Sequence, residues 1–345
     1  MNLIGEHVDY NGGRCLPMAL TRCTTAVVTL REDGLLSVTT ESRRWSGAMD
    51  NLDAPVVDAD AWVLYVVGVL IALEVEHGMD IEISSDVPVG AGLSSSAALE
   101  CSVAVAVNEA LELGRSPDEL VDACVLAEGE TVGAPTGGLD QAIAIHGSAE
   151  HALLIDFAAG TREQVPFDPA VHGLAVLVID TKVSHELTDG GYGSRRDDAW
   201  AAAEQLGLDK RALAQATSLD GLPEQLMRRA RHVVSEVKRV DDFVAALRTD
   251  DWAMLGPLMD ASHASLRDDY EVSCEELDVA VETASQAGAL GTRMTGGGFG
   301  GSAIALVPLE RVNAVQSAVA TAFLARGWAE PDFFTAEPGA GARFD

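Results

Sequence analysis

Residues 88–98 have the sequence PVGAGLSSSAA and connect two segments of different character. Before them, Asp80–Ser84 alternates isoleucines with acids, which predicts a half-exposed strand. After them, residues 97–111 form an apolar run of helical length. Glycines let the backbone approach a ligand closely, and the N-terminus of a helix favours anions. The stretch therefore predicts either a phosphate-binding loop between strand and helix or a plain turn that ends in a serine N-cap.

The segments on either side predict an α+β protein. In the first half we expect a hairpin around Asp33-Gly34, joining strands 24–30 and 35–40, a helix over 61–76, and a helix that begins at Ser116-Pro117 and ends near 131. In the second half we expect strands at 152–156, 174–180 and 302–307, a loop over 185–198, a helix near 311–326, and a helical stretch over 197–290 broken at 207, 221–223 and 256–257. These segments indicate two domains, 1–178 and 179–345.

The chain is strongly acidic. Its 345 residues carry 23 Lys+Arg against 54 Asp+Glu, a formal net charge of −31, which argues against nucleic acid or an anionic membrane as a partner. Its three lysines are Lys182, Lys210 and Lys238, so none lies in the first half. A phosphate bound there would have to be held by backbone N–H groups, a helix N-terminus and a metal ion.

Cysteine spacing and apolar runs indicate the compartment. Five scattered cysteines without a CxxC pattern predict reduced thiols, and neither a secretory signal nor a run long enough to span a bilayer is present. We therefore expect a cytoplasmic protein.

A second glycine-rich stretch, GGGFGG, occupies residues 296–301. Gly296, Gly298 and Gly301 satisfy the GxGxxG pattern of dinucleotide-binding proteins, but a strand-like run follows where that pattern requires a helix. A GxxxxGK[ST] loop, a GxSxG elbow and an HExxH pair are all missing from the sequence, so P-loop and hydrolase functions have little support. The plainer interpretation of 296–301 is a tight turn between two core elements.

Acidic side chains gather in three short stretches. Glu6, His7 and Asp9 suit a polyhydroxylated ligand, although the following Asn11-Gly12 is typical of an ordinary turn. Asp140 predicts either a helix N-cap or a desolvated base. Glu128 and Glu130 are interpreted either as solvated helix acids or as metal ligands. His146, His151, His172 and His232 show no metal-binding spacing, and we expect them in the core or on the surface.

Four stretches together resemble the GHMP kinase superfamily and, within it, the galactokinases. They are NLIGEHVDYNGG at 2–13, PVGAGLSSSAA at 88–98, residues 127–141, and MTGGGFGGS at 294–302, and the first of them is the specific one. The resemblance covers essentially the whole chain. It implies a two-lobed α+β fold, with a ribosomal-protein-S5-like N-terminal lobe, a ferredoxin-like C-terminal lobe and an active site between the lobes.

The resemblance also implies an activity and a set of site residues. It implies transfer of the ATP γ-phosphoryl group to the C1 hydroxyl of α-D-galactose, the first committed step of galactose catabolism, with Mg²⁺ as cofactor and Asp140 as catalytic base. Matches to the sugar contacts are Glu6, His7, Asp9, Gly137 and Tyr192. Matches to the ATP loop are Pro88, Gly90, Ala91, Gly92, Leu93, Ser94, Ser95, Ser96 and Ala97, and matches to Mg²⁺ ligands are Ser96 and Glu128. We expect a monomer whose partners are galactose and ATP.

Alternatives remain within and outside the enzyme class. A kinase of another sugar, such as N-acetylgalactosamine or arabinose, would share the first motif, and a galactose and ATP sensor without catalysis would share most of it. The intact Ser95-Ser96-Ala97-Ala98 run favours an enzyme over a sensor. The family motif begins Gly-Arg-Val-Asn-Leu-Ile, so Met1 falls on its valine. We therefore expect that the true start of the protein lies upstream of Met1 and that an active-site arginine precedes Met1. A chain without that arginine would fold poorly and turn over slowly.

Overall fold

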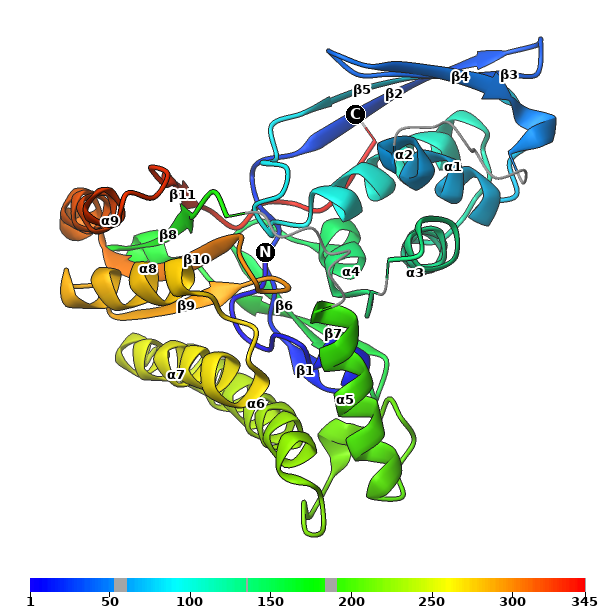
Figure 1. Ribbon diagram of the computed structural model, residues 1–345. Helices are drawn as coiled ribbons and strands as arrows, with labels where there is room; N and C mark the ends of the chain where they lie inside the picture. The colour runs from blue at the N-terminus through cyan, green and yellow to red at the C-terminus, as the bar shows by residue number, and fades with distance from the viewer. Residues whose placement is uncertain (53–60, 135, 184–190, 345) are drawn as a thin grey trace. The chain divides into compact units, whose positions relative to one another are not determined.

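The computed structural model of the protein (Figure 1) describes residues 1–52, 61–134, 136–183 and 191–344. It divides into two compact units that each draw on separate stretches of the chain. Unit 1 comprises residues 1–21, 89–93 and 148–339, and unit 2 comprises residues 22–88, 94–147 and 340–345. The chain therefore crosses between the units several times, whereas the sequence suggested a single boundary after residue 178, a position inside strand β8 (Leu174–Asp180).

Unit 2 consists of one four-stranded sheet and its helices. The strands are β2 (Thr24–Arg31), β3 (Leu35–Thr39), β4 (Arg44–Ala48) and β5 (Gly78–Ser85), and the helices are η2 (Met49–Asn51), α1 (Ala61–Ala72), α2 (Ser95–Ala110), α3 (Pro117–Leu126), the π-helical η3 (Ala127–Val132) and α4 (Leu139–His146). Figure 1 shows α1, α2 and α3 on one side of this sheet.

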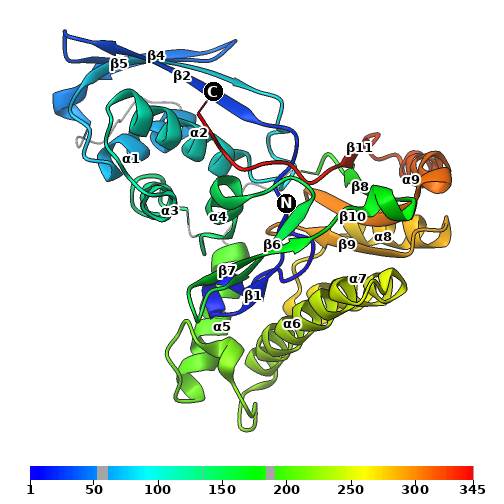
Figure 2. The same ribbon diagram turned by 180° about the vertical axis from the view of Figure 1, so that it is seen from behind.

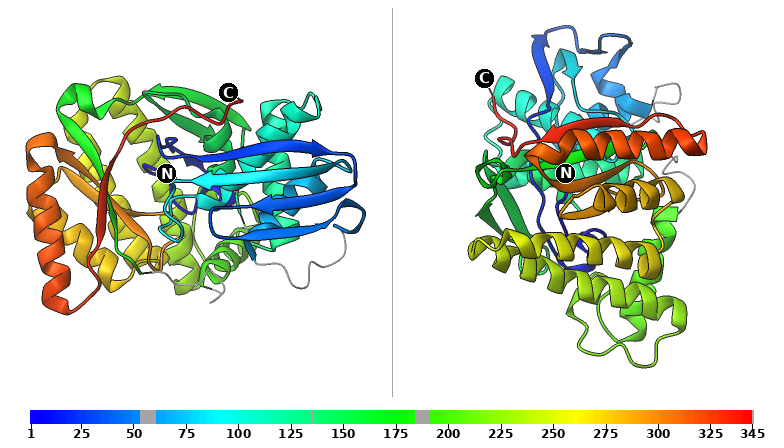
Figure 3. Two further views of the ribbon diagram at one scale, coloured as in Figure 1. Left: turned by 90° about the horizontal axis from the view of Figure 1, so that it is seen from above. Right: turned by 90° about the vertical axis from the view of Figure 1, so that its left-hand side faces the viewer.

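The strand order β2-β5-β3-β4 (Figure 3, left) corrects the expected hairpin. β2 and β3 do not pair with each other, because β5 lies between them, antiparallel to β2 and parallel to β3. Arg31 explains part of this arrangement: it pairs with Asp33 in the turn and with Asp80 on β5 at 2.9 Å. The turn at Asp33-Gly34 is real, but its two strands separate after it. β3 instead pairs with β4, a strand that the sequence pattern did not predict.

The helices of unit 2 follow the sequence closely at their starts. Ser116 caps α3 with a capping box to Glu119, as expected for Ser-Pro-Asp-Glu. α1 ends at Ala72 rather than near 76, and Glu74 adopts a left-handed φ of 58° just after it. Because α1 is apolar on all sides, its valines and leucines fill the core of this unit together with the inner faces of β3 and β5.

Unit 1 contains two sheets and the long helices. Its strands are β1 (Arg14–Cys15), β6 (His151–Asp156), β7 (Thr161–Pro166), β8 (Leu174–Asp180), β9 (Gly291–Thr295), β10 (Ser302–Pro308) and β11 (Asp332–Ala336). Its helices are η1 (Asp9–Asn11), η4 (Pro169–His172), α5 (Gly191–Gln205), η6 (Leu213–Gln215), α6 (Glu224–Arg248), α7 (Trp252–Ser265), η7 (Leu266–Tyr270), α8 (Glu275–Gln286), η8 (Leu309–Arg311) and α9 (Val312–Arg326).

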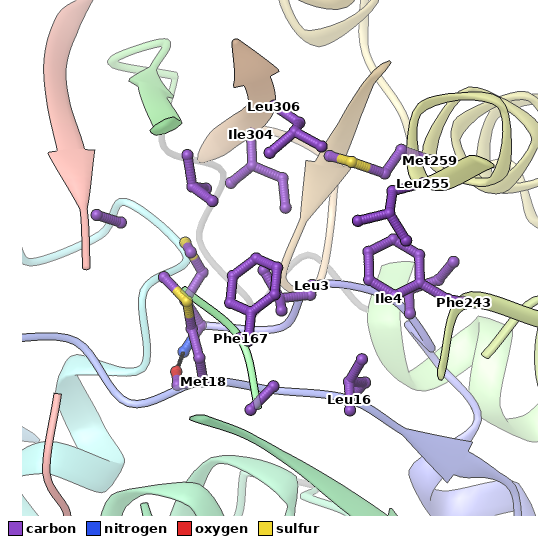
Figure 4. Close-up of a cluster of buried hydrophobic side chains, with 14 of the residues drawn as sticks. Leu3, Ile4, Leu16, Met18, Phe167, Phe243, Leu255, Met259, Ile304 and Leu306 are labelled. Carbon is purple, nitrogen blue, oxygen red and sulfur yellow. Dashed lines mark hydrogen bonds between the residues drawn. The ribbon is translucent and has the colours of Figure 1, made fainter. Parts of the chain in front are cut away.

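The sheets of unit 1 have the orders β1-β6-β7 and β11-β8-β10-β9. β8 is an inner strand and is buried along its whole length, as its apolar sequence predicted. The smaller sheet lies beside α6, and Figure 2 shows the two together. Unit 1 has a hydrophobic core in which Leu3 and Ile4 of the N-terminal segment lie next to side chains of α6, α7 and β10 (Figure 4).

Three expectations for unit 1 require correction. The loop expected over 185–198 is helical from Gly191, the first residue of α5, while 185–190 lies outside the described residues. The expected helix break at 256–257 is wrong, because α7 runs through both residues. Gly256 serves a different purpose: a Cβ there would lie 1.9 Å from the carbonyl oxygen of Leu290, so the glycine allows α7 to approach β9 closely. β7, β9 and β11 were not expected.

Within the described residues, no helix is long and apolar enough to cross a membrane. All five cysteines belong to the described residues and are free thiols.

Candidate active site

The predicted site residues divide between the two units. Unit 1 carries Glu6, His7, Asp9, Tyr192 and the loop residues Gly90, Ala91, Gly92 and Leu93. Unit 2 carries Pro88, Ser94, Ser95, Ser96, Ala97, Glu128, Gly137 and Asp140. Each set is described within its own unit.

In unit 1, the segment Gly5–His7 follows directly from Leu3 and Ile4 in the core. Gly5 has a φ of 99° and His7 a φ of 61°, so two of three consecutive residues lie in the left-handed region. A side chain on Gly5 would lie 2.8 Å from the carbonyl oxygen of Arg14, which explains why glycine is needed there. The strained backbone turns the side chains of Glu6 and His7 into a polar interior.

The Glu6 carboxylate is surrounded by donors of the sheet that carries β9. Its Oε1 accepts hydrogen bonds from the Thr295 hydroxyl at 3.0 Å and from the Gly296 backbone N–H at 2.9 Å. Arg293, which is fully buried, places Nη2 3.4 Å from the same oxygen. Burial raises the pKa of Glu6, and Arg293 opposes that rise by favouring the charged form. The carboxylate is thus fixed in one orientation next to the second glycine-rich stretch.

His7 belongs to a cluster of aromatic rings. Its Nδ1 lies 2.8 Å from the Tyr10 hydroxyl, which in turn lies 3.0 Å from the Tyr270 hydroxyl. The ring of Tyr192, at the start of α5, is centred 5.4 Å from the His7 ring. Burial lowers the pKa of His7 to about 3, so the imidazole is neutral at physiological pH. The structure therefore brings together two of the expected sugar-contact residues, His7 and Tyr192.

Asp9 begins the short helix η1, which is closed by Gly12 in a left-handed conformation. Asn11 donates its Nδ2 proton to the His7 carbonyl oxygen at 2.8 Å. The two interpretations of this stretch are therefore compatible: Asn11-Gly12 forms a turn, and the turn holds the polar residues that precede it.

The two glycine-rich stretches meet in unit 1. Residues 296–301 form the tight connection between the antiparallel strands β9 and β10, which was the plainer of the two interpretations. A Cβ on Gly296 would lie 2.8 Å from the carbonyl oxygen of Gly92, and Ser302 Oγ donates to the Ala91 carbonyl oxygen at 2.7 Å. Residues 296–302 therefore pack against the backbone of Ala91 and Gly92 in the first half of the expected phosphate loop.

In unit 2, the second half of that loop enters α2 without a serine cap. Ser94 occupies the N-cap position with a left-handed φ of 62°, and its side chain makes no capping hydrogen bond. A serine therefore holds the expected N-cap position, but its hydroxyl does not occupy the first-turn N–H groups of α2. Asp140 is not an N-cap: it is the second residue of α4, and Gly138 holds the N-cap position with a φ of 92°.

Unit 2 also contains a buried carboxylate cluster, formed by Glu100, Glu128 and Gln141. The Gln141 Nε2 group donates to Glu100 Oε2 at 3.1 Å and to Glu128 Oε2 at 2.6 Å. Glu100 and Gln141 are fully buried and Glu128 nearly so. Burial, reinforced by the negative charge of Glu128, raises the pKa of Glu100 to about 9. One amide therefore serves two carboxyl groups.

The surroundings of Glu128 fit the expected metal ligands in part. Burial raises the pKa of Glu128; Gln141 opposes that rise, the charge of Asp140 adds to it, and the nearby Ser96 side chain opposes it. Ser96 and Glu128 are thus neighbours, and hydroxyl and carboxylate oxygens are ligands that Mg²⁺ accepts. Among the described residues, no group of three or more His, Cys, Asp or Glu side chains is arranged to hold a metal ion.

Several residues of the site were not expected from the sequence. Arg293, Thr295, Tyr270 and Gln141 contact expected residues but come from distant parts of the chain. His232 was expected only as a core or surface residue; it is fully buried, and its Nε2 lies 3.0 Å from the Glu6 carbonyl oxygen. Thr295 and Gln141 lie inside stretches that carry the family resemblance, but no local pattern assigned a role to any of these residues, because each contacts a partner more than ten residues away.

Comparison with known proteins places the chain in a family. The GHMP kinases N terminal domain matches residues 64–148, the GHMP kinases C terminal domain matches residues 243–325, and the galactokinase galactose-binding signature matches residues 1–30.

Relatives match over nearly the whole chain. A galactokinase of Streptomyces coelicolor is 44% identical over 360 residues, covering 99% of this chain and 92% of the relative. A galactokinase of Mycobacterium tuberculosis is 41% identical over 340 residues, covering 96% and 93%. The crystal structure of Lactococcus lactis galactokinase complexed with galactose is 34% identical with a TM-score of 0.92, covering 99% of this chain and 92% of that one. The chain belongs to the galactokinase family of GHMP kinases.

Proposed function

We propose that the protein transfers the γ-phosphoryl group of ATP to the C1 hydroxyl of α-D-galactose, giving galactose 1-phosphate and ADP. The observation that carries the proposal is the galactose-binding signature itself. Its residues Glu6 and His7 are buried, oriented by hydrogen bonds and joined by Tyr192, on a chain similar over 99% of its length to a galactokinase that was crystallised with galactose.

The residues of unit 1 would bind the sugar. A carboxylate accepts hydrogen bonds from sugar hydroxyls, and a neutral imidazole can both donate and accept. Glu6 and His7 are suited to this because their orientations are set before a ligand arrives, which reduces the entropy lost on binding. We assign Asp9 and Tyr192, and Gly137 of unit 2, to the same sugar by their match to the sugar contacts of the family.

The remaining expected residues, which belong to unit 2 except for the loop residues 89–93 of unit 1, would bind the phosphates and accept the proton. We assign Asp140 as the base that takes the proton of the C1 hydroxyl as the bond to phosphorus forms. The loop 88–97 would hold the phosphates of ATP through its backbone N–H groups and the N-terminus of α2, which suits a half-chain without lysine. Ser96 and Glu128 would hold Mg²⁺, which when bound neutralises charge on the phosphates.

The test is galactose-dependent release of ADP by the full-length protein, measured with a coupled assay. Asp140→Asn should lower kcat by at least about 100-fold, since general bases contribute on that scale. Asp122→Asn, an exposed aspartate on α3 of the same unit, is the matched control and should leave kcat unchanged. Full activity of the Asp140→Asn protein would remove the assigned base.

A panel of sugars separates this function from its alternatives. Faster turnover with N-acetylgalactosamine or arabinose than with galactose would make the protein a kinase of that sugar. Binding of galactose and ATP without release of ADP would make it a sensor.

The proposal includes a monomer that works in the cytoplasm, where ATP is supplied, on small-molecule substrates only. Size-exclusion chromatography with light scattering tests the first part, and cell fractionation tests the second.

A further inference from the structure

The support beneath the segment Gly5–His7 comes from helix α6. His232 and Glu236 are four residues apart on this helix, so their side chains project from the same face. Both side chains are fully buried. Each of them contacts the backbone of a different residue in the segment.

Glu236 holds the first residue. Its Oε1 accepts the Gly5 backbone N–H at 3.0 Å and the Ser262 hydroxyl at 2.6 Å, and its Oε2 accepts from Arg239 Nε at 2.6 Å. Burial alone would raise the pKa of Glu236, but Arg239 and its neighbours lower it to about 2. The carboxylate is therefore charged, fully hydrogen-bonded and fixed.

His232 holds the second residue. Its Nε2 lies 3.0 Å from the Glu6 carbonyl oxygen and its Nδ1 lies 2.9 Å from Ser265 Oγ. A carbonyl oxygen can only accept, so Nε2 carries the proton and the Ser265 hydroxyl donates to Nδ1. Since burial lowers the pKa of His232 to about 4, the neutral ring keeps this single tautomer at physiological pH.

The hydrogen bond from His232 to the Glu6 carbonyl affects His7, the next residue in the chain. The peptide between Glu6 and His7 includes the Glu6 carbonyl, and His7 follows it in a left-handed conformation that is unfavourable for a non-glycine residue. A change in ψ of Glu6 or in φ of His7, the torsions on either side of that peptide, would re-aim the Glu6 and His7 side chains relative to each other. A donor to the Glu6 carbonyl opposes such a change.

We propose that His232 is a positioning residue for the sugar site: by donating its Nε2 proton to the Glu6 carbonyl oxygen, it fixes the peptide that aims Glu6 and His7 at the sugar. The inference rests on the proposed function, because it gives those two side chains their ligand.

Two matched variants isolate this hydrogen bond. The side-chain amide of His232→Gln extends to about the position of Nε2 and can donate to Glu6, whereas that of His232→Asn reaches only the position of Nδ1, next to Ser265. Both variants lose the imidazole ring that packs against Tyr270 at 4.6 Å, so they share the packing loss. The difference between them reports on the bond to Glu6.

His232→Asn should raise the KM for galactose at least about tenfold, the effect expected for one buried hydrogen bond, while the KM for ATP changes less than about twofold. His232→Gln should recover most of the galactose KM. Calorimetric titration of galactose without ATP should show the same ranking, independently of turnover. Equal galactose affinities for the two variants would overturn the proposal.

Ser265→Ala covers the case in which His232→Asn does not fold. It keeps the imidazole but removes the donor that fixes the tautomer, and it should raise the galactose KM by about twofold to fivefold. An unchanged galactose KM in a folded Ser265→Ala protein would also overturn the proposal. Failure of the proposed function has a different signature: the wild-type protein would then release no ADP in response to galactose.

Discussion

The polar cluster of unit 1 surrounds Glu6 with donors, whereas the carboxylate cluster of unit 2 leaves two glutamates to share one amide. Around Glu6, a hydroxyl and a backbone N–H donate to a single oxygen, and the charged Arg293 Nη2 lies 3.4 Å from the same oxygen. Around Glu100, one oxygen accepts from Gln141 and the other, Oε1, has no hydrogen-bond partner among the described residues. Both clusters are buried, so the difference lies in the balance of donors and acceptors.

Burial is the main cause of the pKa shifts in both clusters, and the type of group that is buried decides the direction of each shift. In unit 1, His7 and His232 are neutral, and their pKa values are lowered to about 3 and about 4. The unfolded chain binds more protons than the folded one below pH 6.5, so this cluster loses stability as pH falls from 6.5 towards 3. In unit 2, Glu100 has its pKa raised to about 9, so the folded state binds the extra proton, and stability falls as pH rises from 4.5 through 9. The two histidines of unit 1 therefore weaken the fold at low pH, and Glu100 weakens it at high pH; Glu6, whose pKa burial also raises, acts in the same direction as Glu100.

The largest effect on this difference between the clusters is expected from a substitution at Gln141. Gln141→Leu removes the amide that Glu100 and Glu128 share and deprives both buried carboxyl groups of that donor. We expect a loss of roughly 2–4 kcal/mol in the free energy of unfolding at pH 7, because unsatisfied buried groups cost about 1–3 kcal/mol each. Urea denaturation measures this loss. Gln286→Leu, an exposed glutamine on α8, is the control, and a loss at Gln141 no larger than that of the control would mean that the carboxyls find other donors.

Glu100→Gln tests the pH dependence of stability in unit 2, because it keeps the shape of the side chain and removes its charge. Without added Mg²⁺, this variant should match the wild-type stability near pH 4.5 and exceed it increasingly as pH rises to 9, by roughly 1–3 kcal/mol at the upper end. Urea denaturation at a series of pH values checks the divergence. A constant difference across the whole range would show that Glu100 does not titrate on unfolding as described.

The smallest effect is expected at Thr295. Thr295→Val removes a hydroxyl that donates to Glu6, but the Gly296 N–H still donates to the same oxygen. We therefore expect the galactose KM to rise only about twofold to fivefold, equivalent to roughly 1 kcal/mol or less, with kcat nearly unchanged. Steady-state kinetics provide the measurement. Thr321→Val on the exposed side of α9 is the control, and a collapse of kcat at Thr295 would assign it to the chemical step instead.

Local patterns predicted the parts of this fold that depend on neighbouring residues. The capping box at Ser116, the buried strand at 174–180 and the tight turn at 296–301 all follow from residue types and spacings within a few positions. The same kind of signal failed where a glycine had a distant partner. Gly256 suggested a helix end, but it is required by the approach of Leu290.

The sequence by itself determined the family, and it predicted which residues would meet a sugar and a nucleotide, because the family motifs around Glu6, Gly90 and Asp140 are continuous in the chain. Tertiary structure alone decided how those residues are held. The Gly5 N–H finds its acceptor 231 residues away and the Glu6 carbonyl its donor 226 residues away. Buried polar groups must form hydrogen bonds with whichever partner the packed fold brings near, and periodicity along the chain does not indicate which residue that partner is.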